Sequence, residues 1–259
     1  MHSILQTRFC RRAFTLIELL VVIAIIALLL GIIVPVLKKA KQKAQSLVCS
    51  SNLASIGKAI HAYAADNKDA IPLGPKARLN TGSDFYPATG CVTSLLSRLG
   101  DGAPVGLGLL LNSYLSSQPK VLFCPAADQP SEVDKQLALV GENQAQGDYY
   151  YRHGSVAAME DDPTLSVYIR LSNLGKNRDG RSITALVMDV QFLAHPSLTP
   201  FRVVTRTSHK QKISNILFAD GQVASQDNTD GRFTVDIGVY PYDALDKILK
   251  AFELADEYR

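Results

Sequence analysis

The sequence predicts an α+β fold in which a long N-terminal helix packs on an antiparallel sheet with short helices and loops. Residues 19–37 carry no charge, and apolar residues then continue at helical spacing to about Asn67. The second half of the chain instead holds short runs rich in Val, Ile, Tyr and Phe, with turn residues between them. The chain has 259 residues, which is enough to bury one ordinary core after the uncharged segment.

The uncharged segment has the length of a helix that crosses a bilayer. Each Leu, Ile, Val or Phe contributes roughly −0.3 to −0.6 kcal/mol to insertion, whereas a central acidic residue costs about +2.5 to +3.5 kcal/mol. The segment therefore inserts despite Glu18 near its start. An ionisable group in a membrane span needs a partner, and a free amino group would serve. Pro35 removes a backbone donor, so we expect a kink or local unwinding there.

The run Ala13-Phe14-Thr15-Leu16-Ile17-Glu18-Leu19 resembles the processing site of type IV prepilins and type II secretion pseudopilins. The family usually has Gly in place of Ala13, and it places a proline where this chain has Pro35. The resemblance implies that a prepilin peptidase cleaves between Ala13 and Phe14 and methylates the new amine of Phe14. It also implies that Glu18 pairs with the amine of a neighbouring subunit during assembly.

The same resemblance implies four parts: a leader (1–13), the membrane half of the helix (14–37), its soluble half (38–67) and a pilin-like head (68–259). The chain would lie in the inner membrane as a single-pass protein, with a cytoplasmic leader and a periplasmic or extracellular head. The implied partners are the prepilin peptidase/methyltransferase, other pilin-like subunits and further copies of the chain, the inner-membrane assembly machinery and membrane lipid. The implied product is a secretion pseudopilus or a pilus-like filament.

Other functions have less support in the residues. A signal-anchored surface protein that binds a ligand and forms no filament is the main alternative. No metal-type histidine spacing, phosphate loop or serine elbow indicates an enzyme or a cofactor. The formal net charge is +3 and the basic residues are dispersed, so no nucleic-acid partner is expected, and the cluster 38–43 would meet lipid headgroups. The acidic run 160–162 is more often a solvated loop than a calcium site.

The head is expected to begin with a loop-rich connector after Asn67. Expected helices and strands follow in this order: helix 105–115, strand 120–124, helix 129–140, strands 148–152, 183–191, 201–206, 213–219 and 222–225, and helix 243–259. Asp220-Gly221 predicts a tight hairpin turn in which both residues take positive backbone angles. Tyr149, Tyr150 and Tyr151 are expected to place alternate rings in the core. The last helix would be capped by Asp243 and would present Glu253, Asp256 and Glu257 as an acidic exterior.

His209, followed by Phe218-Ala219-Asp220-Gly221, resembles the C-terminal signature of a large subgroup of pseudopilin-like proteins. The gap from His209 to Asp220 is one residue longer than the subgroup's usual gap, which fits a bulge or a longer loop before the strand. His209 could be a ligand, but a lone histidine near such a turn is more often a hydrogen-bonded structural residue.

The cysteines permit at most one internal disulfide in the processed chain. The sequence has four cysteines, and Cys10 would leave with the leader. The residues alone leave the pairing open, and three reduced, buried thiols are the alternative. The subgroup resemblance extends to the segments around Cys49 and Cys124 and not to Cys91, which implies a disulfide between Cys49 and Cys124.

Overall fold

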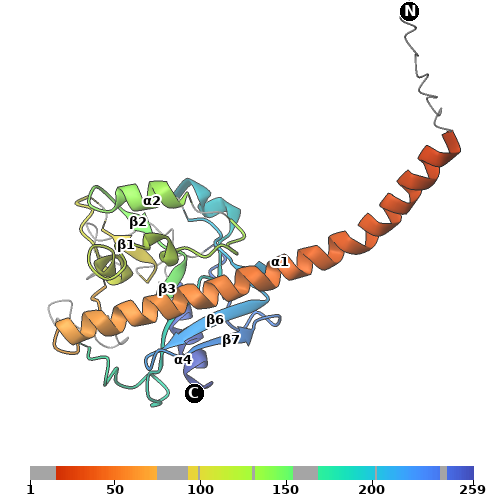
Figure 1. Ribbon diagram of the computed structural model, residues 1–259. Coiled ribbons are helices and arrows are strands. Elements are labelled where there is room, and N and C mark those ends of the chain that lie inside the picture. The colour runs from red at the N-terminus through yellow and green to blue at the C-terminus, as the bar shows by residue number, and fades with distance from the viewer. Residues whose placement is uncertain are drawn as a thin grey trace, which may run out of the picture. The chain divides into compact units, whose positions relative to one another are not determined.

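The computed structural model describes residues 16–74, 93–98, 100–129, 132–153, 169–201, 203–239 and 244–259. The chain divides into two compact units, Met1–Lys43 and Ala44–Arg259, which are described separately here. The predicted α+β class is confirmed, because one long N-terminal helix is followed by antiparallel sheets and short helices (Figure 1).

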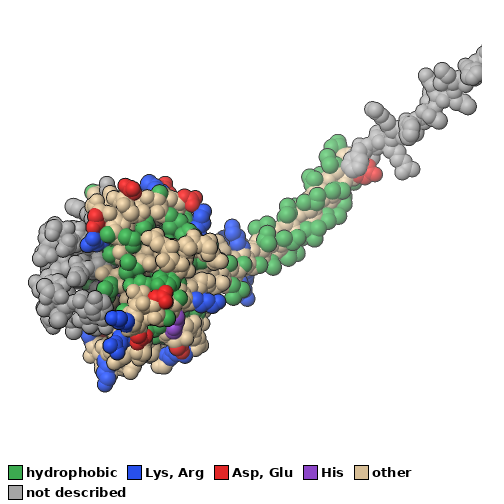
Figure 2. Space-filling model, turned by 60° about the vertical axis from the view of Figure 1, so that its left-hand side comes forward, with side chains coloured by type: hydrophobic (Ala, Val, Ile, Leu, Met, Phe, Trp, Pro, Cys, Tyr) green, Lys and Arg blue, Asp and Glu red, His purple; other side chains and the backbone are tan. Residues whose placement is uncertain are grey.

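The described part of the first unit is the beginning of helix α1 (Leu16–Asp66). All of its side chains from residue 16 to residue 43 are exposed, and those up to residue 37 are almost entirely apolar, as the green side chains of Figure 2 show. Among the described residues, α1 is the one helix that is long and apolar enough to cross a membrane. The helix continues through Pro35 without the local unwinding considered above, since a proline removes a single hydrogen bond and its neighbours keep theirs.

In the second unit, α1 becomes an element of the core. Its fully buried side chains recur three or four residues apart: Cys49, Leu53, Ile56 and Ile60. This face lies against strand β6 (Ile213–Phe218) at Gly57, where a Cβ atom would come 2.9 Å from Leu217 Cδ1. The glycine therefore permits the helix to approach the sheet closely.

The central sheet has four strands in the order β3-β4-β6-β7, and all neighbours are antiparallel. Its other strands are β3 (Tyr149–Tyr151), β4 (Ala185–Asp189) and β7 (Val223–Asp227). One face of the sheet packs on α1 and the other on helix α4 (Ala244–Asp256). Tyr149, Tyr150 and Tyr151 are therefore all about 1% exposed. The expectation of alternate rings in the core was wrong because both faces of this strand are covered.

Shorter elements complete the head. The two small strand pairs are β1 (Leu95–Ser97) with β2 (Ala145–Gln146), antiparallel, and β5 (Phe192–Leu193) with β8 (Val235–Asp236), parallel. The short helices are η1 (Gly106–Leu110), η2 (Pro119–Leu122), α2 (Val133–Leu139), η3 (Pro196–Phe201) and η4 (His209–Gln211), of which all but α2 are 3-10 helices.

Several expected elements were wrong in type or length. The strand expected at 120–124 is the helix η2, and the Cys124 N–H that follows it donates to Asp148 Oδ2 over 3.2 Å rather than to a strand. The described residues of 201–206 form no strand; in that segment Phe201 ends η3 and Arg206 forms an isolated bridge with Phe192. The helices expected at 105–115 and 129–140 are reduced to η1 and α2.

The hairpin β6–β7 and the C-terminal helix are confirmed, but the turn of the hairpin differs from the expected type. Gly221 has a φ of 86°, whereas Asp220 keeps a negative φ. The Gly221 N–H donates to the Phe218 carbonyl over 2.9 Å, and the Phe218 N–H donates to the Gln222 carbonyl over 2.8 Å. This pattern is a three-residue turn with a glycine bulge, which needs one left-handed residue rather than two. Asp243, the expected cap of α4, lies outside the described residues.

Candidate functional site

The N-terminal candidate site is described from the first turn of α1 onward. Ala13 and Phe14 lie outside the described residues, as do Cys10, Cys91 and the acidic run 160–162. Glu18 lies in the first turn of α1, where a negative charge is favourable because the helix dipole is positive at that end. Pro35 lies inside the same helix, and exposed lysines follow the apolar stretch from residue 38 to residue 43.

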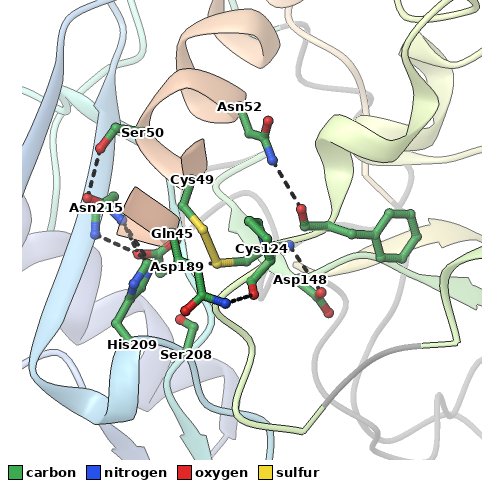
Figure 3. Close-up of a disulfide and its surroundings, with 12 residues drawn as sticks. Gln45, Cys49, Ser50, Asn52, Cys124, Asp148, Asp189, Ser208, His209 and Asn215 are labelled. Atoms are coloured by element: carbon green, nitrogen blue, oxygen red, sulfur yellow. Dashed lines mark hydrogen bonds and ion pairs between the residues drawn. A yellow bond between two sulfur atoms is a disulfide. The ribbon is translucent and has the colours of Figure 1, made fainter. Parts of the chain in front are cut away.

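A second candidate site surrounds a disulfide in the head (Figure 3). The structure joins Cys49 and Cys124, the pair implied by the subgroup resemblance; their Cα atoms are 5.5 Å apart and they are separated by 75 positions in the sequence. Two further side chains of α1 hold the segment that carries Cys124. Gln45 Nε2 donates to the Pro125 carbonyl over 2.8 Å, and Asn52 Nδ2 donates to the Phe123 carbonyl over 3.1 Å. The spacing of Gln45, Cys49 and Asn52 places the two hydrogen bonds and the disulfide on one face of the helix.

His209 lies beside this disulfide. Its Nε2 atom is 3.5 Å from Cys124 Sγ and 3.1 Å from Asp189 Oδ2. The side chains of His209 and Asp189 are 3% and 0% exposed. Asp189 Oδ2 also accepts hydrogen bonds from the backbone N–H and the Nδ2 amide of Asn215, over 2.8 and 2.7 Å. His209 Nε2 also lies 3.1 Å from Asn215 Nδ2. Because the Asp189 carboxylate can only accept, a hydrogen on Nε2 would be donated to Asp189.

The polar network extends from the disulfide to three strands and α1. Asn215 Oδ1 accepts hydrogen bonds from Ser50 on α1 and from Ser225 on β7. Asp189 on β4 and Asn215 on β6 connect these contacts to His209 (Figure 3). Asp189 Oδ1 is buried and has no hydrogen-bond partner within the described part of the chain. Burial raises the pKa of the neighbouring Tyr149 hydroxyl, and the Asp189 carboxylate raises it further, so this hydroxyl stays neutral.

The backbone at His209 is left-handed over three successive residues, with φ of 52°, 53° and 59° for His209, Lys210 and Gln211. Non-glycine residues rarely take this conformation, so the surrounding contacts must hold it. The His209 N–H donates to the Ala126 carbonyl over 2.9 Å, and the Lys210 N–H donates to Asp128 Oδ2 over 3.0 Å. This turn precedes β6 and directs the imidazole of His209 toward Cys124.

Asp220 and Gly221, which were expected to form a signature with His209, lie at the opposite end of β6. Asp220 Oδ1 accepts the Gln222 N–H over 3.0 Å, and its carboxylate pairs with the C-terminal Arg259. The Arg259 guanidinium also lies over the ring of Phe218, 5.5 Å from its centroid. His209 and Asp220-Gly221 are therefore brought to two separate places, and the latter pair joins the hairpin to the end of the chain.

Residues 8–34 match the family of the prokaryotic N-terminal methylation motif. The chain carries the N-terminal motif of type IV prepilins and pseudopilins. The match includes Ala13, Phe14 and Glu18; it does not extend to Pro35 or to the C-terminal signature. No curated protein and no solved structure matches the chain. Together with the apolar beginning of α1, the motif indicates a membrane-anchored, single-pass, prepilin-like precursor, and prepilin-like proteins are generally structural rather than catalytic.

The head of this prepilin-like chain also contains a buried polar cluster that the sequence did not indicate. Arg152 Nη1 donates to Asp256 Oδ2 over 2.8 Å, with both side chains at most 2% exposed. Arg178 forms a bidentate pair with Glu253. The acidic exterior expected on the last helix was therefore wrong for Glu253 and Asp256, which are 7% and 3% exposed. Their arginine partners lie far away in sequence, and no local pattern could have found them.

Proposed function

We propose that this chain is a pilin-like subunit. A prepilin peptidase/methyltransferase would cleave it between Ala13 and Phe14 and methylate the Phe14 amine. The mature chain would stay in the inner membrane through residues 14–37 and assemble through this helix into a secretion pseudopilus or a pilus-like filament. The observation that supports this proposal best is the methylation motif at residues 8–34, placed directly at the start of a helix whose apolar surface is exposed all round.

The exposed apolar surface requires a non-aqueous partner. Ile17, Leu20 and Leu28 are 75%, 64% and 67% exposed, and their neighbours along the helix are similar. Each apolar side chain removed from water contributes about 1.5 to 3 kcal/mol, so the helix is stable only in lipid or against other helices. Membrane lipid before assembly, and further copies or other pilin-like subunits after it, would supply these two environments. The lysines from 38 to 43 would contact lipid headgroups.

Glu18 gives assembly its polar contact. In a bundle of apolar helices two opposite charges attract much more strongly than in water, and one left unpaired is costly. The amine of Phe14 exists only after the leader is removed. Cleavage would therefore create the partner of Glu18, and pairing between neighbouring subunits would set their axial offset. The protein would act as a substrate of the peptidase and a component of the assembly machinery, with no catalytic activity of its own.

The first test is the N-terminus of the chain recovered from membranes of cells that contain an active prepilin peptidase. We expect the chain to begin at Phe14 and to carry one added methyl group by mass spectrometry. The matched control is a strain whose peptidase is inactive, in which the leader should remain. Ala13→Gly restores the usual family residue and should be cleaved at least as fast as the wild type. A wild-type chain that begins before Phe14 despite active peptidase would contradict the processing step.

The second test separates assembly from simple anchoring. Single cysteines placed at Ile23 or Ile26 should give crosslinked dimers and higher oligomers in membranes of cells that contain the assembly machinery, because these side chains would face other subunits. A cysteine at the exposed Lys176 of the head serves as the control for random collision. A signal-anchored protein that binds a ligand on its own would crosslink no more through the helix than through the head.

A further inference from the structure

The disulfide site brings together three side chains that are metal ligands when the cysteines are reduced. The ligand atoms of Cys49, Cys124 and His209 all lie within 4.8 Å of one another. Two thiolates and one imidazole are a ligand set that Zn²⁺ prefers. We propose that, in its dithiol state, this protein binds one zinc ion through Cys49 Sγ, Cys124 Sγ and His209 Nε2.

The distances fit this geometry. Zinc bonds of about 2.3 Å to sulfur and 2.0 Å to nitrogen, at a tetrahedral angle, place the two ligand atoms about 3.5 Å apart. The observed distance from Cys124 Sγ to His209 Nε2 is 3.5 Å. Cys49 faces the same point from α1 (Figure 3). Rotation of the cysteine side chains away from each other would open the tetrahedral position without moving the imidazole.

Asp189 lies beside the imidazole of this ligand set. Its carboxylate already contacts His209 Nε2 through Oδ2, over 3.1 Å, and its Oδ1 atom is buried without a hydrogen-bond partner in the described ranges. When Nε2 binds zinc it carries no hydrogen and no longer donates to Asp189. The carboxylate keeps the two hydrogen bonds from Asn215 and stays beside the imidazole that binds the ion. A buried carboxylate beside thiols is costly alone, and a divalent cation would compensate its charge.

The three ligands are held by contacts that do not depend on the sulfur–sulfur bond. Gln45 and Asn52 bind the backbone on either side of Cys124, so its position relative to α1 survives reduction. The left-handed turn η4 fixes His209, and the hydrogen bonds of its backbone N–H groups belong to Ala126 and Asp128. Lys210 in this turn is exposed, so one turn of chain separates the site from solvent. A preorganised site of this kind binds a metal without refolding the head.

The chemistry balances with a dithiol as reductant. The dithiol transfers two electrons to the Cys49–Cys124 disulfide, which becomes two thiols, and is itself oxidised to a disulfide. Zinc then displaces the two thiol protons, which go to solvent. A newly made chain has its cysteines as thiols before any oxidant acts. The site would thus hold α1 to the head before disulfide formation, which releases the ion.

The test uses the full-length chain in detergent, with Cys10→Ser and Cys91→Ser in every variant, so that Cys49 and Cys124 supply the remaining thiols. The protein is reduced without oxygen, the reductant is removed, and Co²⁺ and then Zn²⁺ are added. We expect one Co²⁺ per chain with the thiolate charge-transfer and tetrahedral d–d absorption bands, displaced by one Zn²⁺. His209→Ala should weaken Zn²⁺ binding by about 100-fold or more, since even residues that support a metal ligand contribute 10- to 100-fold. His195→Ala, at an exposed histidine, is the matched control and should bind as the wild type does.

In the binding experiment, any of three results would overturn the proposal: binding by the reduced chain no tighter than by the oxidised chain, binding equal in His209→Ala and His195→Ala, or cobalt spectra without thiolate bands. Circular dichroism of the reduced chain distinguishes lost ligands from lost structure. If reduction unfolds the head, Zn²⁺ should restore its spectrum in the wild type and fail to do so in Cys49→Ser. A reduced wild-type head that stays unfolded with Zn²⁺ counts against the site. None of these readouts depends on filament assembly.

Discussion

The two halves of α1 have the same backbone and opposite surroundings. From residue 16 to residue 43 every side chain is exposed, whereas from residue 49 onward one face is buried under the sheet and tied covalently at Cys49. Residues 19–37 of the first half are apolar on every side, whereas the second half is amphipathic because one of its faces is buried and the other meets water. The comparison teaches that one continuous helix can belong to the core of the head along one half and present an apolar surface for lipid or other helices along the other half.

A carboxylate in the apolar half of α1 and a carboxylate in the head would therefore behave differently. In the apolar half Glu18 would be surrounded by lipid or by other helices, where water cannot stabilise its charge. In the head, Asp246 pairs with Arg178 and Lys250, and Glu253 pairs with Arg178. The same chemical group can decide assembly in one region and change stability only slightly in the other.

The largest effect is expected from Glu18→Ala. The chain should still insert, since removing a charge favours insertion, but incorporation into filaments should be abolished because the Phe14 amine loses its partner. The measurement is the amount of chain in sheared filaments relative to the amount in membranes. Glu142→Ala, at an exposed carboxylate of the head, is the control and should assemble normally. Normal incorporation of Glu18→Ala would remove the proposed role of this residue.

Loss of the disulfide should be the largest change in the stability of the head. The loop between Cys49 and Cys124 spans 75 positions, so closing it contributes about 4 kcal/mol in the chain-entropy model. Cys49→Ala/Cys124→Ala should lower the free energy of unfolding in guanidinium by this amount and leave membrane insertion unchanged.

Mass analysis with and without reductant checks the bond itself. Peptides that carry Cys49 and Cys124 should be joined before reduction and separate after it. Peptides unchanged by reduction would leave three reduced thiols as the state of the protein.

The two halves of α1 can be compared directly by making the same substitution at an isoleucine in each half. Ile56 is 0% exposed and Ile26 is 49% exposed. Ile56→Ala should destabilise the head by about 3 kcal/mol, because it removes buried methyl groups and leaves a cavity against the sheet. Ile26→Ala should leave the unfolding of the head unchanged. Denaturant titrations of the two variants provide the measurement, and equal destabilisation would show that the apolar half also belongs to the core.

The sequence predicted the parts of this fold that local patterns encode. The uncharged segment and the apolar spacing after it gave α1, alternating runs around Asp220-Gly221 gave the hairpin, and the last apolar spacing gave α4. It failed at 120–124, where apolar residues are buried without joining the sheet, and at 201–206, where Val203 is the one buried side chain among the described residues and Arg206 forms an isolated bridge. In the first of these, Pro119 starts a 3-10 helix and side chains of α1 bind the backbone carbonyls that a strand would have used.

The disulfide cluster could be predicted only in part. The pair Cys49 and Cys124 followed from the resemblance, but Asp189 and Asn215 carried no signal because no motif includes them. His209 is 85 positions from Cys124, and its ring reaches the sulfur through a left-handed turn that sequence patterns do not specify. Metal-type spacing in sequence detects ligands on one element, whereas these come from three separate segments.

The smallest effect is expected at Asp246, a paired carboxylate of the head that faces water. A hydrogen bond from Lys250, and then one from Arg178, lowers its pKa below the ordinary value of 3.8. Because the folded-state pKa is lowered, the carboxylate stabilises the head above about pH 4, and this contribution is lost as the pH falls through the folded-state pKa. The side chain is 41% exposed, so screening limits the contribution to less than about 1 kcal/mol. Asp246→Asn should thus be slightly less stable than the wild type at pH 7 and equally stable at pH 2, as measured by thermal unfolding. A difference in stability that persists at pH 2 would mean that packing rather than charge accounts for the effect of Asp246→Asn. Asp246 would then no longer serve as the exposed carboxylate with which Glu18 is compared.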